Sequence, residues 1–165
     1  MKILMVCLGN ICRSPLAEGI MQRKISEHGL DWQVDSAGTG AWHVGELPDR
    51  RSIATARQFG IDITNQRARQ LKPHDLDRFD IVLAMDNQNY RDILRLATTK
   101  EQEEKVQLIM NFVTPGRNQA VPDPYWDDNG FEQVFRMLEE ACGRVVERFF
   151  RTSHTILNTS QPLLR

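Results

Sequence analysis

Hydrophobic positions fall into short runs that alternate with segments of helical periodicity. The clearest runs are KILMVCL at residues 2–8 and FDIVLAMD at residues 79–86, with weaker ones at residues 32–39 and 105–112. A short, continuously apolar run is typical of a strand that is buried on both faces. We therefore predict four strands. The last is reached across the charged segment TTKEQEEK, which we expect to be a loop.

Polar residues between the runs mark the helices. Ser14, which a proline follows, predicts the N-cap of a first helix that stops at Gly29. A second helix is expected at residues 50–59, and Asp86 is placed to cap a third. The last helix has the strongest periodicity. Its predicted apolar face consists of Phe131, Val134, Phe135, Leu138, Cys142, Val145, Val146 and Phe149.

Buried strands that alternate with helices indicate an α/β protein. We predict an open four-stranded parallel sheet with helices on both faces, a three-layer sandwich of the Rossmann-like or flavodoxin-like kind. Residues 1–152 should form a single domain, with a polar C-terminal tail at residues 153–165. Sheets of this kind bind ligands at the carboxyl ends of their strands, which directs attention to the loop after the first strand.

Composition argues against several classes of partner. The 165 residues carry a formal net charge of −1, with 41% hydrophobic and 26% charged residues, as in ordinary soluble proteins. No basic block is present, so nucleic acid is not an expected partner. The apolar run Ile3–Leu8 is too short for a signal peptide or a lipid anchor, and no segment is long enough to span a bilayer. Three cysteines suggest reduced thiols, and we expect a cytoplasmic protein.

Two of the three cysteines lie in the first loop, VCLGNICRSP. A zinc site would need further ligands, but Cys142 lies on an apolar helix face and the nearest histidine, His28, is at the far end of the first helix. A nucleophile fits better. Cys7 ends the first strand, and Arg13 opens a helix whose unpaired amides and dipole favour both a bound anion and a thiolate.

The spacing Cys-x5-Arg with a following serine predicts a phosphate-binding loop. Gly9 and Asn10 tolerate the left-handed backbone that such a loop needs, and Arg13 can hold two phosphate oxygens at once. An anion cradle above a thiolate suits phosphoryl transfer through a phosphocysteine. The predicted loop consists of Cys7, Leu8, Gly9, Asn10, Ile11, Cys12, Arg13 and Ser14.

With these residues the sequence resembles the low-molecular-weight protein tyrosine phosphatase family. The resemblance rests on VCLGNICRSPLAE, DSAGTGAWHVGELPD, FDIVLAMD and VPDPYW, in that order along the chain. It implies hydrolysis of phosphotyrosine and aryl phosphates with no metal and no cofactor. The implied partners are phosphotyrosine-containing proteins, with phosphate or other oxyanions as inhibitors in the loop. We expect a monomer or a weak dimer.

The chemistry so implied has two steps. Cys7 attacks phosphorus, Arg13 clamps the phosphoryl group, and a carboxylic acid protonates the leaving phenolate and later deprotonates water. The segment VPDPYWDD offers Asp123, between two prolines, with Asp127 and Asp128 as competitors. The resemblance singles out Asp123, and we expect one of the other two to cap the last helix.

Supporting roles are also implied. Ser14 should donate a hydrogen bond to the nucleophilic sulfur, and by resemblance Asn10 and Ser36 brace the loop without chemical roles. Trp42 and Tyr125 lie in polar segments and are expected to form the aromatic walls of a slot for a phenyl ring.

Two positions depart from the usual family pattern. Trp126 stands where many members carry a second tyrosine, and Gln66 stands where eukaryotic members tend to carry a histidine.

The sequence leaves two roles open for Cys12. It is either a small apolar loop residue or a resolving thiol that captures oxidised Cys7 as a reversible disulfide, which would make the enzyme redox-sensitive. Cys142 is assigned to the core.

Three rival functions share parts of this pattern. An arsenate reductase would need further cysteines in the middle of the chain, and residues 82–91 contain none. A protein-arginine phosphatase resembles this loop but carries threonine in place of Ile11. A phosphocysteine carrier of a sugar phosphotransferase system would need no general acid, so the setting of Asp123 argues against it.

Overall fold

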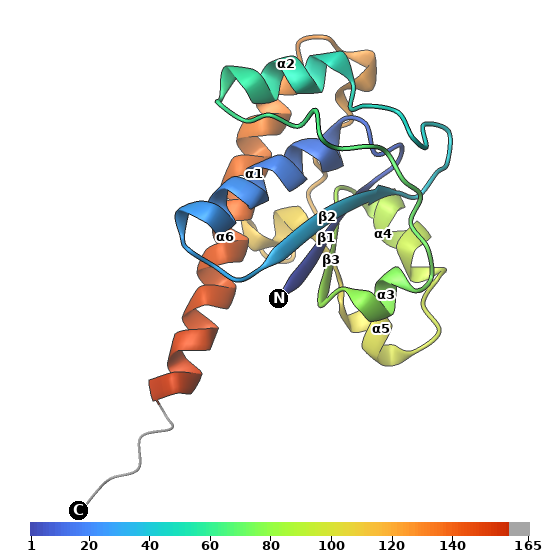
Figure 1. Ribbon diagram of the computed structural model, residues 1–165. Coiled ribbons are helices and arrows are strands. Elements are labelled where there is room, and N and C mark those ends of the chain that lie inside the picture. Colours follow the sequence, from blue (N-terminus) through green and yellow to red (C-terminus); the bar gives the residue numbers. More distant parts are fainter. Residues whose placement is uncertain (159–165) are drawn as a thin grey trace, which may run out of the picture.

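A parallel four-stranded sheet forms the centre of the computed structural model, which describes residues 1–158 (Figure 1). The strand order is β2-β1-β3-β4, which confirms the predicted open sheet. Because β1 pairs with both β2 and β3, the first strand of the chain is an inner strand. The strands are β1 (Lys2–Cys7), β2 (Gln33–Gly38), β3 (Ile81–Ala84) and β4 (Val106–Leu108).

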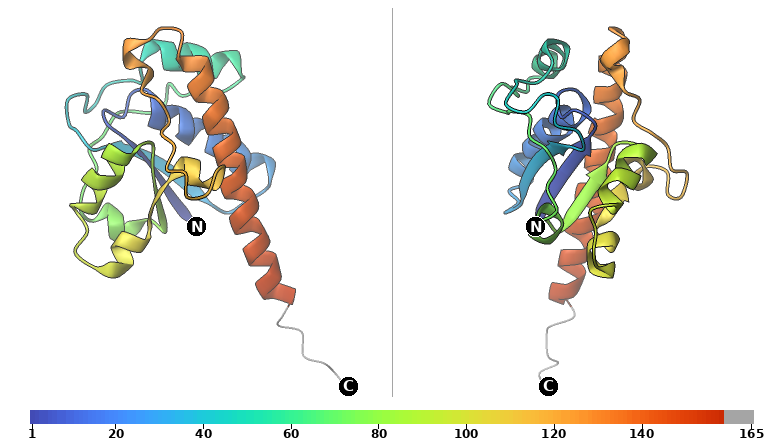
Figure 2. Two further views of the ribbon diagram at one scale, coloured as in Figure 1. Left: turned by 180° about the vertical axis from the view of Figure 1, so that it is seen from behind. Right: turned by 90° about the vertical axis from the view of Figure 1, so that its right-hand side faces the viewer.

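Helices cover both faces of the sheet, as predicted (Figures 1 and 2). One face carries α1 (Arg13–Glu27), α2 (Arg50–Gln58) and α6 (Phe131–Asn158). The other side carries α3 (Asp75–Arg78), α4 (Asn87–Leu94) and α5 (Lys100–Glu104). Two short 3-10 helices complete the description: η1 (Ile109–Phe112) and η2 (Pro124–Trp126).

The side chains of β1 explain why both faces are covered. Ile3, Met5 and Cys7 belong to the apolar core under α1 and α6, whereas Leu4 and Val6 belong to the core under α3 and α4. Successive side chains of a strand point to opposite faces, so a continuously apolar strand needs a helical layer on each side. The same alternation directs Cys7, at the end of the strand, towards the α1 side.

Helix α6 buries the predicted apolar face, except that Phe149 is only partly buried. Phe135 is fully buried and stacks on Phe59, with ring centroids 4.1 Å apart. The helix continues to Asn158, past the predicted domain end at residue 152 (Figure 2). The division into a domain and a tail stays a prediction, and positions 159–165 lie outside the described residues.

Some predicted boundaries are wrong. Helix α1 begins at Arg13 rather than after Ser14, and Cys12 occupies its N-cap without a capping side-chain bond. The hydroxyl of Ser14 is already engaged by Asn10 and Cys7, so it has no part in capping. The predicted stop is confirmed, because Gly29 follows the helix with a positive φ of 60°.

The charged segment before β4 is also not a loop. It forms α5, because the side chain of Thr99 accepts a hydrogen bond from the amide of Gln102 and so caps the helix. Strand β4 has only three residues, and the apolar residues after it turn into η1, which packs against α6. Within residues 1–158, no helix combines the length and the apolar character needed to cross a membrane.

Candidate active site

The loop between β1 and α1 lies at the carboxyl edge of the sheet. It packs tightly against β2, because a Cβ atom added to Gly38 would lie 2.8 Å from the carbonyl oxygen of Leu8. Amides of Thr39 and Gly40 donate to the carbonyl oxygens of Cys7 and Leu8 at 2.9 Å. Only glycine fits at position 38, and the start of the loop is therefore fixed.

Asn10 holds the middle of the loop. Its φ of 56° is left-handed, a conformation that asparagine tolerates better than most residues. Its Nδ2 donates to Ser14 Oγ at 2.8 Å and to Ser36 Oγ at 2.9 Å, and its Oδ1 accepts from the amide of Arg69 at 3.0 Å. Both amide hydrogens of Asn10 are thus used, which orients its side chain.

The orientation of Asn10 determines where the neighbouring hydroxyl protons point. Ser14 Oγ accepts from Asn10, so its own proton is free for another acceptor. That acceptor is Cys7 Sγ, 2.9 Å from Ser14 Oγ. The hydroxyl of Ser14 is therefore directed at the sulfur of Cys7. All three residues are buried.

Arg13 is a buried cation, with only 3% of its side chain exposed. Its Nη1 donates to Asp86 Oδ2 at 2.6 Å and to the carbonyl oxygen of Val121 at 3.0 Å. Burial disfavours the charged guanidinium, but the negative charges of Cys7, Asp86 and Asp123 outweigh it and raise the pKa of Arg13. Arg13 therefore stays charged beneath the loop.

Asp86 has a role that sequence reasoning missed. As predicted it caps α4, with its Oδ1 accepting from the amide of Asn89 at 2.8 Å. Its other oxygen binds Arg13. The position of Asp86 was a usable signal for this contact. Asp86 follows β3, which lies next to β1 in the parallel sheet, so the residues after both strands meet at the same edge.

Asp123 comes from the segment that precedes α6. The amide of Val121 bonds to the carbonyl oxygen of Met85 at 2.8 Å, which ties this segment to the end of β3. Asp123 Oδ1 accepts from the amide of Tyr125 at 3.1 Å, and its Oδ2 lies 3.8 Å from Arg13 Nη2. Its side chain is 38% exposed, so it is open to a ligand and to water.

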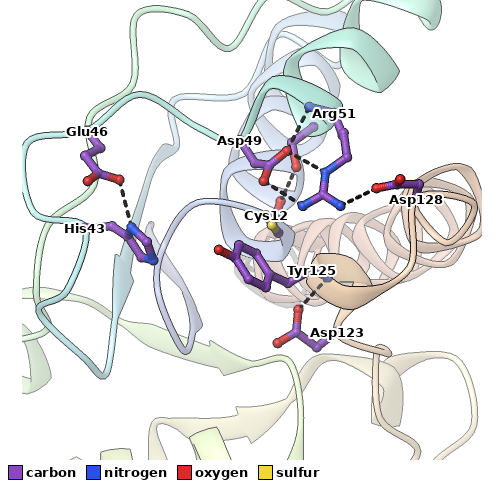
Figure 3. Close-up of polar contacts among 9 residues, drawn as sticks. Cys12, His43, Glu46, Asp49, Arg51, Asp123, Tyr125 and Asp128 are labelled. Atoms are coloured by element: carbon purple, nitrogen blue, oxygen red, sulfur yellow. Dashed lines mark hydrogen bonds and ion pairs between the residues drawn. The ribbon is translucent and has the colours of Figure 1, made fainter.

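The two competing aspartates have other partners. Asp127 Oδ1 accepts from the amide of Asn129, ahead of the helix, and Asp128 binds Arg51 at 2.6 Å (Figure 3). The expectation that one of them caps α6 is therefore wrong, because each carboxylate is engaged before the helix begins at Phe131. Neither residue lines the pocket that contains Asp123.

A pocket opens above the loop, and aromatic residues form its rim. Trp42 and Tyr125 line it, as do Cys7, Arg13 and Asp123. Trp42 is 71% exposed, so it is a rim residue and not part of the core. The pocket therefore has the cation of Arg13 and the sulfur of Cys7 among its lining groups, and exposed aromatic side chains at its rim.

Sequence reasoning missed two further residues that line the same pocket, His43 and Trp126. His43 Nδ1 lies 2.7 Å from Glu46, across the first loop from Tyr125 (Figure 3). The Trp126 ring meets that of Tyr125 edge-on at 4.8 Å. The sequence offered one signal for both residues: they lie in polar segments, where an aromatic side chain is rarely part of the hydrophobic core.

The remaining thiols are both buried. Burial raises the pKa of Cys12 to about 12, helped by the negative charges of Asp49, Cys7 and Asp123. Burial likewise raises the pKa of Cys142, on the buried face of α6, to about 12. Within the described part of the chain, no group of three or more His, Cys, Asp or Glu side chains is arranged to hold a metal ion.

The double role of Asp86 leads to a prediction about stability. Asp86→Ala should lower the free energy of unfolding by about 3 kcal/mol, because it removes both a helix cap and the partner of a buried cation. Thr99→Ala is the matched control, since it removes a cap of α5 but no buried ion pair. It should cost only about 1 kcal/mol. Urea unfolding measures both values, and equal losses would contradict the structural role given to the Arg13–Asp86 pair.

Comparisons with known proteins agree with this geometry. Residues 2–154 match the family model described as low molecular weight phosphotyrosine protein phosphatase. The protein of that name from Schizosaccharomyces pombe is 40% identical over 141 residues, covering 83% of this chain and 89% of the relative.

Solved structures are similar over nearly the whole chain. A protein tyrosine phosphatase from Entamoeba histolytica with Hepes in its active site superposes with a TM-score of 0.86 at 35% identity, covering 93% of this chain and 99% of the other. A Drosophila arginine phosphatase superposes with a TM-score of 0.84 at 34% identity, covering 90% and 98%. The chain belongs to the low molecular weight phosphotyrosine protein phosphatase family, a family of hydrolases.

Proposed function

We propose that the protein hydrolyses phosphotyrosine and other aryl phosphates through a phosphocysteine on Cys7, without a metal ion. The observation that carries the proposal is the position of three groups around one pocket. Cys7 Sγ accepts a hydrogen bond from Ser14 Oγ at 2.9 Å. Buried Arg13 lines the same pocket as Cys7, and the exposed carboxylate of Asp123 is 3.8 Å from Arg13. A nucleophile, an anion clamp and a proton donor therefore meet at one site.

In the first step, the sulfur of Cys7 attacks phosphorus in line with the leaving phenolate. The S–P bond forms as the P–O bond to the ring breaks, and Asp123 gives its proton to the departing oxygen. Arg13 and the amides of the loop bind the equatorial oxygens, where charge spreads in the transition state. Asp86 holds Arg13 in place through its 2.6 Å bond to Nη1.

In the second step, Asp123, now a carboxylate, takes a proton from water. The water oxygen bonds to phosphorus and the S–P bond breaks, which returns Cys7 as a thiolate and releases inorganic phosphate. The hydroxyl of Ser14 stabilises the departing sulfur, and Asn10 keeps that hydroxyl aimed. Ser36 supports Asn10 from the side of β2.

The walls of the slot favour an aryl substrate. Trp42 and Tyr125 would lie on either side of a phenyl ring, and apolar Ile11 lines the same pocket. Because the chain is also similar to an arginine phosphatase, phosphoarginine is the competing substrate. The apolar side chain of Ile11, however, has no group that could hydrogen-bond to the guanidinium of phosphoarginine. The proposed partners are phosphotyrosine-containing proteins of the cytoplasm, a location that three free cysteines support. A monomer or weak dimer stays a prediction.

The first test concerns the nucleophile and the substrate. The purified protein should hydrolyse a phosphotyrosine peptide faster than the matched phosphoarginine peptide, and a metal chelator should not change either rate. Cys7→Ser should abolish both activities, because a hydroxyl is a far weaker nucleophile at neutral pH. Cys142→Ser is the control and should keep the activity. Turnover that survives Cys7→Ser, or that needs added metal, contradicts the mechanism.

The second test concerns the general acid. Asp123→Asn should lower kcat/KM for phenyl phosphate by a factor of roughly 10² to 10⁴, the range for losing a general acid. The loss should shrink for p-nitrophenyl phosphate, whose leaving group needs little protonation. Asp127→Asn is the matched control, since its carboxylate lies outside the pocket. Equal losses for the two substrates would remove Asp123 from this role.

We also propose that Cys12 protects Cys7 from oxidation. Peroxide converts the Cys7 thiolate to a sulfenic acid; the Cys12 thiol then attacks that sulfur, forming a disulfide and releasing water. The two residues share one short loop and both are free thiols. Burial keeps Cys12 protonated in the resting enzyme, and oxidation of Cys7 removes one of the charges that raise the Cys12 pKa.

Recovery from oxidation tests this proposal. After mild peroxide, dithiothreitol should restore the activity of the native protein, because a disulfide is reducible and a sulfinic acid is not. Cys12→Ser should recover much less, whereas Cys142→Ser should recover like the native protein. Equal recovery by all three proteins would leave Cys12 as a packing residue.

A further inference from the structure

Arg51, in the first turn of α2, joins two parts of the active site that are far apart in the sequence. Its guanidinium forms a two-point ion pair with Asp49, in which Nε donates to Oδ1 at 3.0 Å and Nη2 donates to Oδ2 at 2.9 Å. Its third nitrogen, Nη1, donates to Asp128 Oδ1 at 2.6 Å. Figure 3 shows the guanidinium between these two carboxylates. The proposed mechanism gives Arg51 no task.

Asp49 belongs to the side of the phosphate-binding loop. Its amide donates to the carbonyl oxygen of Ile11 at 2.8 Å, and Ser52 Oγ donates to the carbonyl oxygen of Cys12 at 3.2 Å. The carboxylate of Asp49 also caps α2, because it accepts from the amide of Arg51 at 2.8 Å. Two parallel hydrogen bonds to one carboxylate fix the plane of a guanidinium. The orientation of Arg51 is therefore set from the side of the loop.

The segment that carries the proposed general acid, residues 122–129, is called the acid segment below. Val121, just before it, is tied to the end of β3. Among the described residues, the backbone hydrogen bonds of the acid segment itself are local, such as the one from the amide of Tyr125 to Asp123 Oδ1. Its position over the loop therefore depends on contacts made by side chains.

Arg51 supplies several of these contacts. Besides its bond to Asp128, its guanidinium carbon lies 5.6 Å from the ring centroid of Tyr125 and 4.6 Å from that of Phe131. Phe131 is buried at the start of α6, directly after this part of the chain. A guanidinium over an aromatic face is attracted by the charge distribution of the ring. One side chain of α2 thus contacts the acid segment and the helix that follows it.

The ion pair with Asp128 would be weak by itself. The side chain of Asp128 is 83% exposed, and isolated pairs of this kind contribute little. The flat, forked shape of arginine is what makes the arrangement specific, because it binds Asp49 at two points and still presents a face to the aromatic rings. A lysine has the charge but neither of these properties.

We propose that Arg51 is a positioning residue, which fastens the acid segment to the phosphate-binding loop and so keeps Asp123 in place to protonate the leaving group. Arg51 does not line the pocket, so it acts through Asp123 and not on the substrate. This inference rests on the proposed role of Asp123 as general acid, but it makes a separate claim about Arg51.

Arg51→Gln tests the claim, because it removes the fork and the charge but keeps a polar side chain. It should lower kcat/KM for phenyl phosphate about tenfold, since a small misplacement of a catalytic group is costly. The loss for p-nitrophenyl phosphate should be less than about twofold, because that leaving group needs little protonation. Arg50→Gln, an equal change of charge at an exposed neighbour in α2, is the matched control and should behave like the native protein.

A double variant shows whether Arg51 acts through Asp123. Two independent contributions multiply, whereas contributions to one function do not. Arg51→Gln added to Asp123→Asn should therefore cause no further loss of kcat/KM for phenyl phosphate. A further tenfold loss in the double variant would mean that Arg51 acts on something other than the general acid, and it overturns the proposal.

Two other variants keep the test decisive if Arg51→Gln does not fold. Asp128→Ala changes only an exposed side chain and leaves α2 intact. It should lower kcat/KM for phenyl phosphate about threefold, within the range of an exposed ion pair, and leave p-nitrophenyl phosphate unaffected. Arg51→Lys keeps the charge without the fork, so its rate with phenyl phosphate should lie between those of the native protein and Arg51→Gln.

Losses of equal size for the two substrates would show a general disturbance of the site and overturn the positioning role. Native rates in Asp128→Ala or in a folded Arg51→Gln would overturn it too. The proposed function fails separately. If Asp123→Asn shows no dependence on the leaving group, the general acid itself is misassigned. If Asp123→Asn shows that dependence and Arg51→Gln does not, only the role of Arg51 is lost.

Discussion

The site depends on one side-chain amide. Asn10 adopts a left-handed backbone at the turn of the first loop, and its three polar contacts join the loop to β2 and to the segment around Arg69. Because both amide hydrogens are used, the serine hydroxyls on either side must donate away from it. The hydroxyl of Ser14 points to the sulfur of Cys7. A single amide thus fixes the direction of the hydrogen bonds that lead to this sulfur.

The fold supplies the surroundings that this constraint needs. The inner strand β1 delivers Cys7 to the carboxyl edge of the sheet, and β3 delivers Asp86 to the same edge. The segment before α6 is tied to the end of β3, which brings Asp123 within 3.8 Å of Arg13. Regular elements therefore position the charged groups, while the aromatic residues at the rim of the pocket, Trp42 and Tyr125, stay exposed.

Sequence reasoning succeeded where the signal is local. The continuous apolar runs identified β1 and β3, and the Cys-x5-Arg spacing identified the loop. It failed where a tertiary neighbour decides the outcome. Ser14 has the chemistry of an N-cap, but its hydroxyl is taken by Asn10 and Cys7. From the sequence alone, Asp86 is predicted only to cap a helix, and its contact with Arg13 becomes evident only when β3 is placed beside β1.

The most direct test of the account is to identify the atom that receives phosphate during turnover. Asp123→Asn protein mixed with p-nitrophenyl phosphate and quenched rapidly should carry one phosphate, because the second step lacks its base. Mass spectrometry of the digested protein should locate that phosphate on the sulfur of Cys7. Phosphate on Ser14 or another residue, or substrate turnover with no phosphorylated protein at any time, would contradict the central claim.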